Sequence, residues 1–395
     1  MKRGGALDAL TGLRFFAALH VVLFHFAGPV LVQGAAPPWL HHWVGSGYAA
    51  VGVFFVLSGF VLAWNYLDAD GRMEADPRAF WAARVARVYP VYLLTFLLSA
   101  PPTIAASVED NGWKTATLKL AVAGLVALTL LQAWVPRLAL YWNPPGWSVA
   151  VEAFFYAVFP RLAGWLPRLR PSRLPVALGA VWLLGLAPPL LYGWLLPDGP
   201  GPVDAHSGGV WLDAIKFSPL ARLPEFVFGV LLGWAFVRER AAGVAKGSGA
   251  VLAATGAVLL VAAGLAGPRI PYPLMHNALL APVAGLLVYG LARGGGPLGW
   301  LLSRPLWVHL GGASYALYLL QFPVSEAVKA LVGLLAPWVQ LGPVATLVGV
   351  VGGGVLASVL VHRAVETPMR SRVRDLLRPW VEKATPPPRP VAPGA

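Results

Sequence analysis

Two ionisable side chains lie inside the first apolar stretch of the sequence, "LTGLRFFAALHVVLFHF" at residues 10–26. Arg14 and His25 are eleven residues apart, which on an α-helix is a rise of roughly 16 Å and a return to within about 20° of the same face. Arg14 alone is explained as a cation that reaches the membrane surface, and His25 also fits a hydrogen-bonded packing role. Because intramembrane ionisable groups usually mark a site, we favour a functional role for His25.

A carboxylate follows in "WNPPGWSVAVEAFFYAVFP", where Ser148 and Glu152 are four residues apart and share a helix face. If this segment enters the membrane from the outside, Glu152 lies about one helical turn deep, a depth comparable with that of His25. A carboxylate beside a histidine fixes its tautomer and raises its basicity, as a general base requires. A capping or packing role for Glu152 explains the spacing equally well.

Two further pairs combine charged side chains at helical spacing. In "FWAARVARVYPVYLL", Arg84 and Arg87 share one face, where two guanidiniums can grip a phosphate, although their spacing alone favours a simple cytoplasmic basic cluster. Arg222 and Glu225 in "ARLPEFVFGVLLG" are three residues apart and suit a local ion pair. Gln321 in "SYALYLLQFPVSE" has a polar edge of the kind that forms hydrogen bonds between membrane helices.

The composition defines the environment of these residues. The chain of 395 residues is 57% hydrophobic and 12% charged, whereas a soluble protein carries about 25% charged residues. The net charge of +13 arises from short Lys and Arg clusters between apolar runs, which the positive-inside rule explains without a nucleic-acid partner. There is no cysteine, which excludes disulfides and thiolate chemistry. We therefore expect an all-α, polytopic protein of the cell membrane.

Apolar runs recur along nearly the whole chain at lengths that suit transmembrane helices. The expected segments are 10–31, 48–66, 86–106, 117–134, 147–166, 174–196, 217–237, 249–267, 276–292, 307–333 and 342–362. If all basic clusters are cytoplasmic, one segment must fail to cross completely, and 117–134 is the weakest candidate. We expect about ten crossings, one re-entrant or interfacial helix, both termini in the cytoplasm, and a basic, Pro-rich, disordered tail at 371–395.

Motifs for metal or hydrolase chemistry are missing from the sequence. No HExxH, P-loop or GxSxG pattern occurs. Asp68 and Asp70 in "LDADGR" resemble part of a metal loop, but Ala79 stands where a calcium loop has its final glutamate. We expect no metal site.

Several ordered stretches together resemble the integral-membrane acyltransferase family type three. They are "LDALTGLRFFAALHVVLFHF", "VGVFFVLSGFVLAW", "RVARVYPVYLL", "WSVAVEAFFYAVFP", "RLPEFVFGVLLG" and "ASYALYLLQFPV", with Glu366 and Pro368 at the end. The likeness covers about residues 7 to 370, and we expect residues 1–370 to form one membrane-embedded domain. Ala153 departs from the family, which often has a second acidic residue there. The chain ends soon after the last span, so we expect no fused extracytoplasmic domain. We therefore infer no substrate from the family members that carry such a domain.

The resemblance implies transfer of an acyl group, commonly acetyl, from acyl-coenzyme A (acyl-CoA) to a hydroxyl of a carbohydrate, glycolipid or natural product. It implies His25 as the base or transient acyl carrier and Glu152 as its partner, with no metal. The cofactor side would hold Arg14, Arg84 and Arg87, and the supporting residues would be Ser148, Tyr89, Arg222, Glu225 and Gln321. The alternative from another class is a transporter or flippase of a sugar-containing or anionic substrate, in which the same groups line a path. Consumption of the thioester distinguishes the two.

Overall fold

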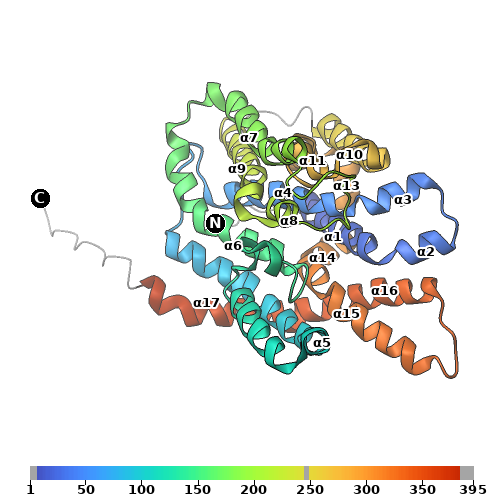
Figure 1. Cartoon of the computed structure of the whole chain (residues 1–395). Coiled ribbons are helices and arrows are strands. Elements are labelled where there is room, and N and C mark those ends of the chain that lie inside the picture. Colours follow the sequence, from blue (N-terminus) through green and yellow to red (C-terminus); the bar gives the residue numbers. More distant parts are fainter. Residues whose placement is uncertain (1–6, 244–248, 383–395) are drawn as a thin grey trace, which may run out of the picture.

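The computed structural model describes residues 7–243 and 249–382, which form helices and connecting loops without a β-strand (Figure 1). The long helices are α1 (Asp8–Phe26), α4 (Ala50–Tyr66), α5 (Pro77–Leu128), α6 (Gly146–Trp165), α7 (Leu174–Leu195), α9 (Pro219–Ala241), α10 (Gly249–Ala266), α12 (Ala281–Ala292), α15 (Ser314–Leu335) and α16 (Pro343–Val361). The shorter ones are α2 (Gly28–Gln33), α3 (Pro38–Gly45), α8 (Val210–Phe217), α11 (Tyr272–His276), α13 (Gly296–Leu302) and α14 (Pro305–Gly312), followed by α17 (Thr367–Glu382).

The helix lengths and composition confirm an all-α polytopic membrane protein. Within the described ranges, nine helices are long and apolar enough to cross a membrane, or up to ten if one bent pair is a single span. That pair is Ala278–Ala292 with Gly296–Leu302, which meet at 79°. Most helix boundaries fall within a few residues of the predicted segments, because the length of each apolar run fixes the length of a crossing.

The long helix α5 reverses direction at Gly112, whose φ of 69° and ψ of 159° interrupt the helical geometry. Glycine adopts this positive φ without a steric penalty. The returning arm, residues 113–128, packs along the first arm, and the hydroxyl of Tyr92 donates a hydrogen bond of 2.8 Å to the carbonyl of Ala127. The arm therefore ends inside the bundle. It corresponds to segment 117–134, for which the sequence predicts an incomplete crossing, and α6 continues from that depth.

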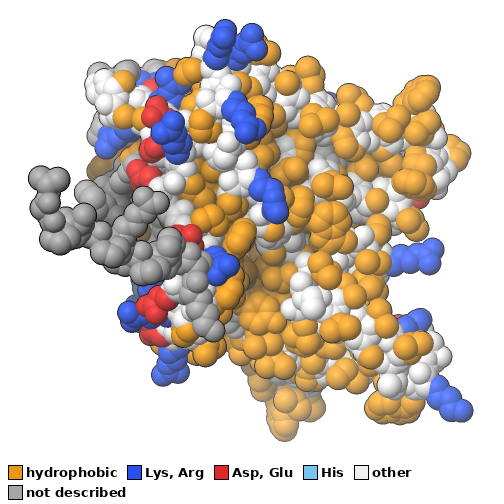
Figure 2. Space-filling model, turned by 90° about the vertical axis from the view of Figure 1, so that its left-hand side faces the viewer, with side chains coloured by type: hydrophobic (Ala, Val, Ile, Leu, Met, Phe, Trp, Pro, Cys, Tyr) orange, Lys and Arg blue, Asp and Glu red, His pale blue; other side chains and the backbone are white. Residues whose placement is uncertain are grey.

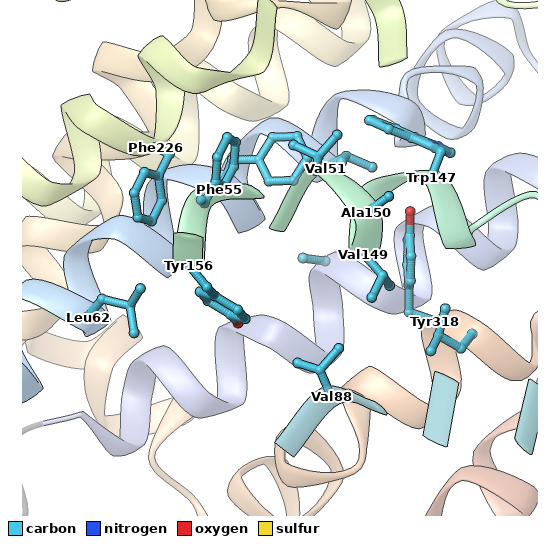
Figure 3. Close-up of a cluster of buried hydrophobic side chains, with 14 of the residues drawn as sticks. Val51, Phe55, Leu62, Val88, Trp147, Val149, Ala150, Tyr156, Phe226 and Tyr318 are labelled. Atoms are coloured by element: carbon cyan, nitrogen blue, oxygen red, sulfur yellow. The ribbon is translucent and has the colours of Figure 1, made fainter. Parts of the chain in front are cut away.

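Side chains from α4, α5, α6, α9 and α15 meet in a buried hydrophobic cluster (Figure 3). The rings of Phe155 and Phe226 stack there with centroids 4.5 Å apart. Helices α4 and α9 approach so closely that a Cβ on Gly229 would overlap the carbonyl oxygen of Val56. Small residues allow this backbone contact between membrane helices. The packed cluster forms the scaffold that positions the polar side chains described below.

The outer surface is apolar over the spanning helices. Large hydrophobic side chains on α7, α10 and α16 are exposed, among them Leu183, Leu184, Val258, Val348 and Leu356. Hydrophobic side chains cover much of the face seen in Figure 2, and Lys and Arg side chains lie in separate groups around them. This surface suits contact with lipid, where exposed apolar side chains carry no penalty.

The disorder predicted for residues 371–395 does not extend to residues 371–382, which are helical in α17. The part of the prediction that concerns 383–395 lies outside the described residues. Helix α17 packs against α5, and the guanidinium of Arg78 lies 5.6 Å from the ring centroid of Trp380. Composition alone missed this helix, because its apolar side chains are few and gain their partners only from another part of the chain.

Candidate active site

A cavity of about 360 Å³ inside the bundle collects ionisable side chains from three helices. They are Arg14 of α1, Arg84 and Arg87 of α5, and Glu152 of α6. Hydroxyl groups also line it, from Ser58, Ser148, Tyr156, Tyr315 and Tyr318. We call this space the arginine cavity. The fold thus brings together all three arginines predicted for the cofactor side, along with Glu152 and Ser148.

The arginines give the cavity an excess of positive charge. The Nη2 atom of Arg84 donates a hydrogen bond of 2.9 Å to the hydroxyl of Tyr66, and its guanidinium lies 5.3 Å from the centroid of that ring. The Nε atom of Arg84 is buried and has no hydrogen-bond partner in the described ranges 7–243 and 249–382. Arg14 interacts electrostatically with Arg87 and with Glu152. Because one carboxylate faces three guanidiniums, the cavity suits an anionic ligand, which guanidinium groups bind through charge-assisted hydrogen bonds.

A second carboxylate, Glu366, does not line the cavity and is 1% exposed. It ends a π-helical turn, a feature that is frequent at functional sites. The Nδ1 atom of His362 lies 2.9 Å from one of its oxygens, and Arg370 donates a hydrogen bond of 2.6 Å to the other. Glu366 also interacts electrostatically with Arg87. This carboxylate balances part of the positive charge from outside the cavity.

Ser148, Glu152 and Tyr156 are spaced four residues apart on α6, so one helix face presents all three to the cavity. The hydroxyl of Ser58 on α4 donates a hydrogen bond of 2.9 Å to Oε1 of Glu152. The Ser148 hydroxyl donates to the carbonyl of Pro145 at 3.0 Å, within the first turn of α6. The Glu152 side chain is therefore fixed by a neighbouring helix rather than used as a helix cap.

His25 pairs with Gln321 near the other end of α1. Its Nδ1 atom lies 2.9 Å from Oε1 of Gln321, and Nε2 of Gln321 donates a hydrogen bond of 2.8 Å to the carbonyl of Tyr318. The second bond orients the amide so that its oxygen faces the imidazole, which favours the tautomer with the proton on Nδ1. The Nε2 atom of His25 is then the basic nitrogen. His25 is an exposed residue in the last turn of α1.

The predicted pairing of His25 with Glu152 is not formed. Glu152 lines the arginine cavity, whereas His25 is absent from its lining and bonds Gln321 instead. The reason is the depth at which α6 begins. Gly146 accepts a hydrogen bond of 3.0 Å from Gln132 in the bundle interior, so α6 does not enter from the membrane surface. Glu152 consequently lies closer to the Arg14 end of the bundle.

Three predicted supporting residues hold the scaffold and do not line the cavity. Tyr89 donates a hydrogen bond of 3.0 Å to the carbonyl of Leu128, which fixes the returning arm of α5. Arg222 and Glu225 form a fully buried ion pair with an N–O distance of 2.9 Å.

Arg222 also contacts His276, which lies outside the spanning helices, with 3.1 Å between Nη1 and Nδ1. Burial and the Arg222 guanidinium hold the pKa of His276 well below its ordinary value. The neutral imidazole can therefore accept a hydrogen bond from the guanidinium.

Sequence reasoning missed three residues of the site. Tyr156 repeats the four-residue spacing that links Ser148 to Glu152, so the helical period alone could have found it. Ser58 stands inside an apolar run and gave no signal without knowledge of its partner. Glu366 is part of the family resemblance in the sequence, but its spacing gave no sign that it is buried beside the arginines.

A membrane-spanning helical bundle that encloses arginines, hydroxyls and a carboxylate defines a polytopic membrane protein with an internal polar site. A family model described as an acyltransferase domain matches residues 7–363. The chain belongs to this acyltransferase family, as its motifs suggest, and it is an enzyme that transfers acyl groups.

Three relatives illustrate the likeness. The acyltransferase MdmB of Streptomyces mycarofaciens is 31% identical over 384 residues, covering 92% of this chain and 91% of the relative. The exopolysaccharide production protein ExoZ of Rhizobium meliloti is 31% identical over 337 residues, covering 85% of this chain and 92% of the relative. The O-acetyltransferase OatA of Staphylococcus aureus is 22% identical over 342 residues, covering 80% of this chain and 50% of that protein. No solved structure matches the chain with statistical significance.

Proposed function

We propose that this enzyme transfers an acyl group, most simply acetyl, from acyl-CoA to a hydroxyl of a carbohydrate, glycolipid or natural product. The observation that carries the proposal is the convergence of Arg14, Arg84 and Arg87 on one cavity. Coenzyme A is a polyanion joined to a long, uncharged pantetheine arm. A cavity that combines guanidiniums with hydroxyl and apolar walls matches both parts of that molecule.

The two arginines of α5 are the proposed phosphate grip. Arg84 and Arg87 lie one helical turn apart, so both guanidiniums can reach one phosphate group. The cavity volume of about 360 Å³ accommodates the acyl-pantetheine arm and leaves the nucleotide outside. Tyr156, Tyr315 and Tyr318 present ring faces and hydroxyls along this arm. Arg14 and Glu152 are the proposed polar pair beside it.

His25 is the proposed general base, with Gln321 rather than Glu152 as its orienting partner. Its Nε2 atom would take the proton of the acceptor hydroxyl as the oxygen attacks the thioester carbonyl. The new carbon–oxygen bond forms, the carbon–sulfur bond breaks, and the proton passes to the departing thiolate of coenzyme A. The hydrogen bond from Nδ1 to Gln321 supports this role, because it leaves Nε2 free to accept.

The printed names of two relatives support the proposed class of acceptor. The name of ExoZ refers to exopolysaccharide production, and that of OatA to O-acetyl transfer. We place the enzyme in the cell membrane with both termini in the cytoplasm, where the basic clusters lie by the positive-inside rule. Acyl-CoA would then enter the arginine cavity from the cytoplasm.

The test is binding and slow hydrolysis of acetyl-CoA by the protein in nanodiscs. We expect binding by the wild type, and a loss of binding in Arg84→Ala/Arg87→Ala. The matched control is Arg168→Ala/Arg170→Ala, which removes two exposed arginines outside the cavity lining. Absence of acetyl-CoA binding by the wild type, or equal loss in both double variants, would overturn the proposal.

A further inference from the structure

A second pocket lies between α5 and α15 and has a volume of about 470 Å³. We call it the α5–α15 pocket. Both helices also line the arginine cavity, but with residues nearer their N-termini, so the two spaces are offset along the same helices. The ring of Phe322, which lines the second pocket, lies 5.2 Å from the ring of His25. Gln321, the partner of His25, directly precedes Phe322. The pocket thus adjoins the proposed base on the side away from the arginines.

The two spaces differ in charge. The arginine cavity holds three guanidiniums, whereas the described residues that line the α5–α15 pocket include Asp110 and Glu326 but no Lys or Arg. Glu326 pairs with Lys329 on the exposed side of α15, at an N–O distance of 2.8 Å. Asp110 forms no ion pair among the described residues and is exposed. Lys119 donates a hydrogen bond to Asn111, which also lines the pocket, so Asp110 is the group that disfavours an anionic ligand there.

Hydrogen-bonding groups and an aromatic surface line the same pocket. Ser99 is 5% exposed, and its hydroxyl has no hydrogen-bond partner among the described residues. It is therefore a buried polar group that a ligand can satisfy. The hydroxyls of Ser107 and Tyr141 lie 2.8 Å apart, a pair able to bind a further hydroxyl. Trp142 lines the pocket and is held by stacking on Phe96 at 4.4 Å. Hydroxyls beside fixed aromatic rings suit a polyhydroxylated ring.

We propose that the α5–α15 pocket binds the acceptor as an uncharged sugar ring and presents one of its hydroxyls toward His25. This inference rests on the proposed acyl transfer and specifies its second substrate. Donor and acceptor would then reach the base from opposite ends of the same two helices. The carboxylate of Asp110 would exclude acidic sugars, and Ser99 would gain its missing partner from the sugar.

The experiment uses the absence of cysteine from the chain. A single thiol is introduced by Ala106→Cys, at a position that lines the pocket. The matched control is Ala105→Cys, the exposed neighbour on the same helix, which does not line the pocket. Alkylation by a polar maleimide is timed in nanodiscs with methyl β-glucoside or methyl β-glucuronide, without acetyl-CoA. When the neutral glycoside is present at a concentration of twice its Kd, the pocket is empty in about one third of the protein molecules. Alkylation therefore slows about threefold.

The expected result is saturable protection at the Ala106→Cys thiol by the neutral glycoside only, and none at the Ala105→Cys thiol. Adding Asp110→Asn should let the glucuronide protect as well, whereas the neighbouring Glu109→Gln should not. No protection by either glycoside, or stronger protection by the glucuronide, overturns the inference. A protein that turns over acetyl-CoA but shows no protection contradicts the acceptor pocket alone. Protection without any binding of acetyl-CoA contradicts the proposed donor, and the two failures are thereby separated.

Discussion

The imidazole of His25 on α1 and the amide of Gln321 on α15 meet with Nδ1 and Oε1 2.9 Å apart. They are 296 residues apart in the chain, so only the tertiary fold creates this contact. A neutral amide oxygen fixes the histidine tautomer without adding a charge to the bundle. This distinguishes the site from a histidine–carboxylate pair, in which the carboxylate also stabilises the protonated ring.

Gln321→Leu removes the acceptor for Nδ1 while it keeps an apolar side chain of similar size. We expect kcat for acetyl-CoA hydrolysis to fall about two- to thirteenfold, which corresponds to the loss of one hydrogen bond of about 0.5–1.5 kcal/mol. The Kd for acetyl-CoA should not change, because Gln321 does not line the arginine cavity. The same change at the exposed Gln340 is the control. Equal turnover in the wild type and Gln321→Leu would remove the orienting role.

Glu152→Gln keeps an acceptor oxygen for Ser58 but removes the negative charge that faces Arg14. The cavity becomes more positive, so we expect the Kd for acetyl-CoA to stay equal or decrease. Turnover should fall about tenfold, a change of roughly 1.4 kcal/mol in the activation free energy, because Arg14 loses the negative charge with which it interacts. Isothermal titration and thioester hydrolysis measure the two effects separately. Weaker binding by this variant, relative to Glu109→Gln, contradicts the assigned charge balance.

The sequence predicts those parts of the site that depend on residues close together in the chain, and not those that depend on contacts between distant segments. The spanning helices and the Ser148–Glu152 face follow from local hydropathy and helical period, and both were predicted correctly. The convergence of Arg14 with Arg84 and Arg87 needed the family resemblance, because their spacing alone favoured a simple basic cluster. Local patterns carry no information on which helices become neighbours.

The predicted contact between His25 and Glu152 failed for a related reason. That contact requires α6 to start at the membrane surface, because only then does Glu152 lie at the depth of His25. The returning arm of α5 ends beside Tyr92 in the bundle interior, and α6 begins there, next to Gln132. The reversal at Gly112 that causes this offset depends on a single backbone conformation, which the hydropathy pattern does not register.

Acetyl-pantetheine tests the phosphate grip, because it carries the thioester without the phosphates of coenzyme A. The wild type should use it with a kcat/KM about 10- to 100-fold below that for acetyl-CoA, since charge-assisted hydrogen bonds to Arg84 and Arg87 are lost. In Arg84→Ala/Arg87→Ala the two donors should perform equally. A double variant that still prefers acetyl-CoA as strongly as the wild type would show that the phosphates bind elsewhere.

The buried pair of Arg222 and Glu225 is expected to support stability rather than catalysis. Glu225→Ala leaves an unpaired guanidinium that is 0% exposed and should lower the free energy of unfolding by about 3–5 kcal/mol. Thermal unfolding, monitored by fluorescence-detected size-exclusion chromatography, measures the effect. Replacement of both partners by methionine should restore much of the loss, whereas Glu382→Ala, in an exposed pair with Arg378, should change little. A wild-type melting temperature for Glu225→Ala would contradict this account.

The most direct test of the central claim is to measure acetyl-CoA binding and turnover side by side for the wild type and His25→Ala in nanodiscs. Our account predicts a similar Kd for both proteins, because His25 lies outside the lining of the arginine cavity. It predicts that turnover falls by about 10²- to 10⁴-fold, the usual contribution of a positioned base. Normal turnover by His25→Ala would contradict the account, since no base would then be lost.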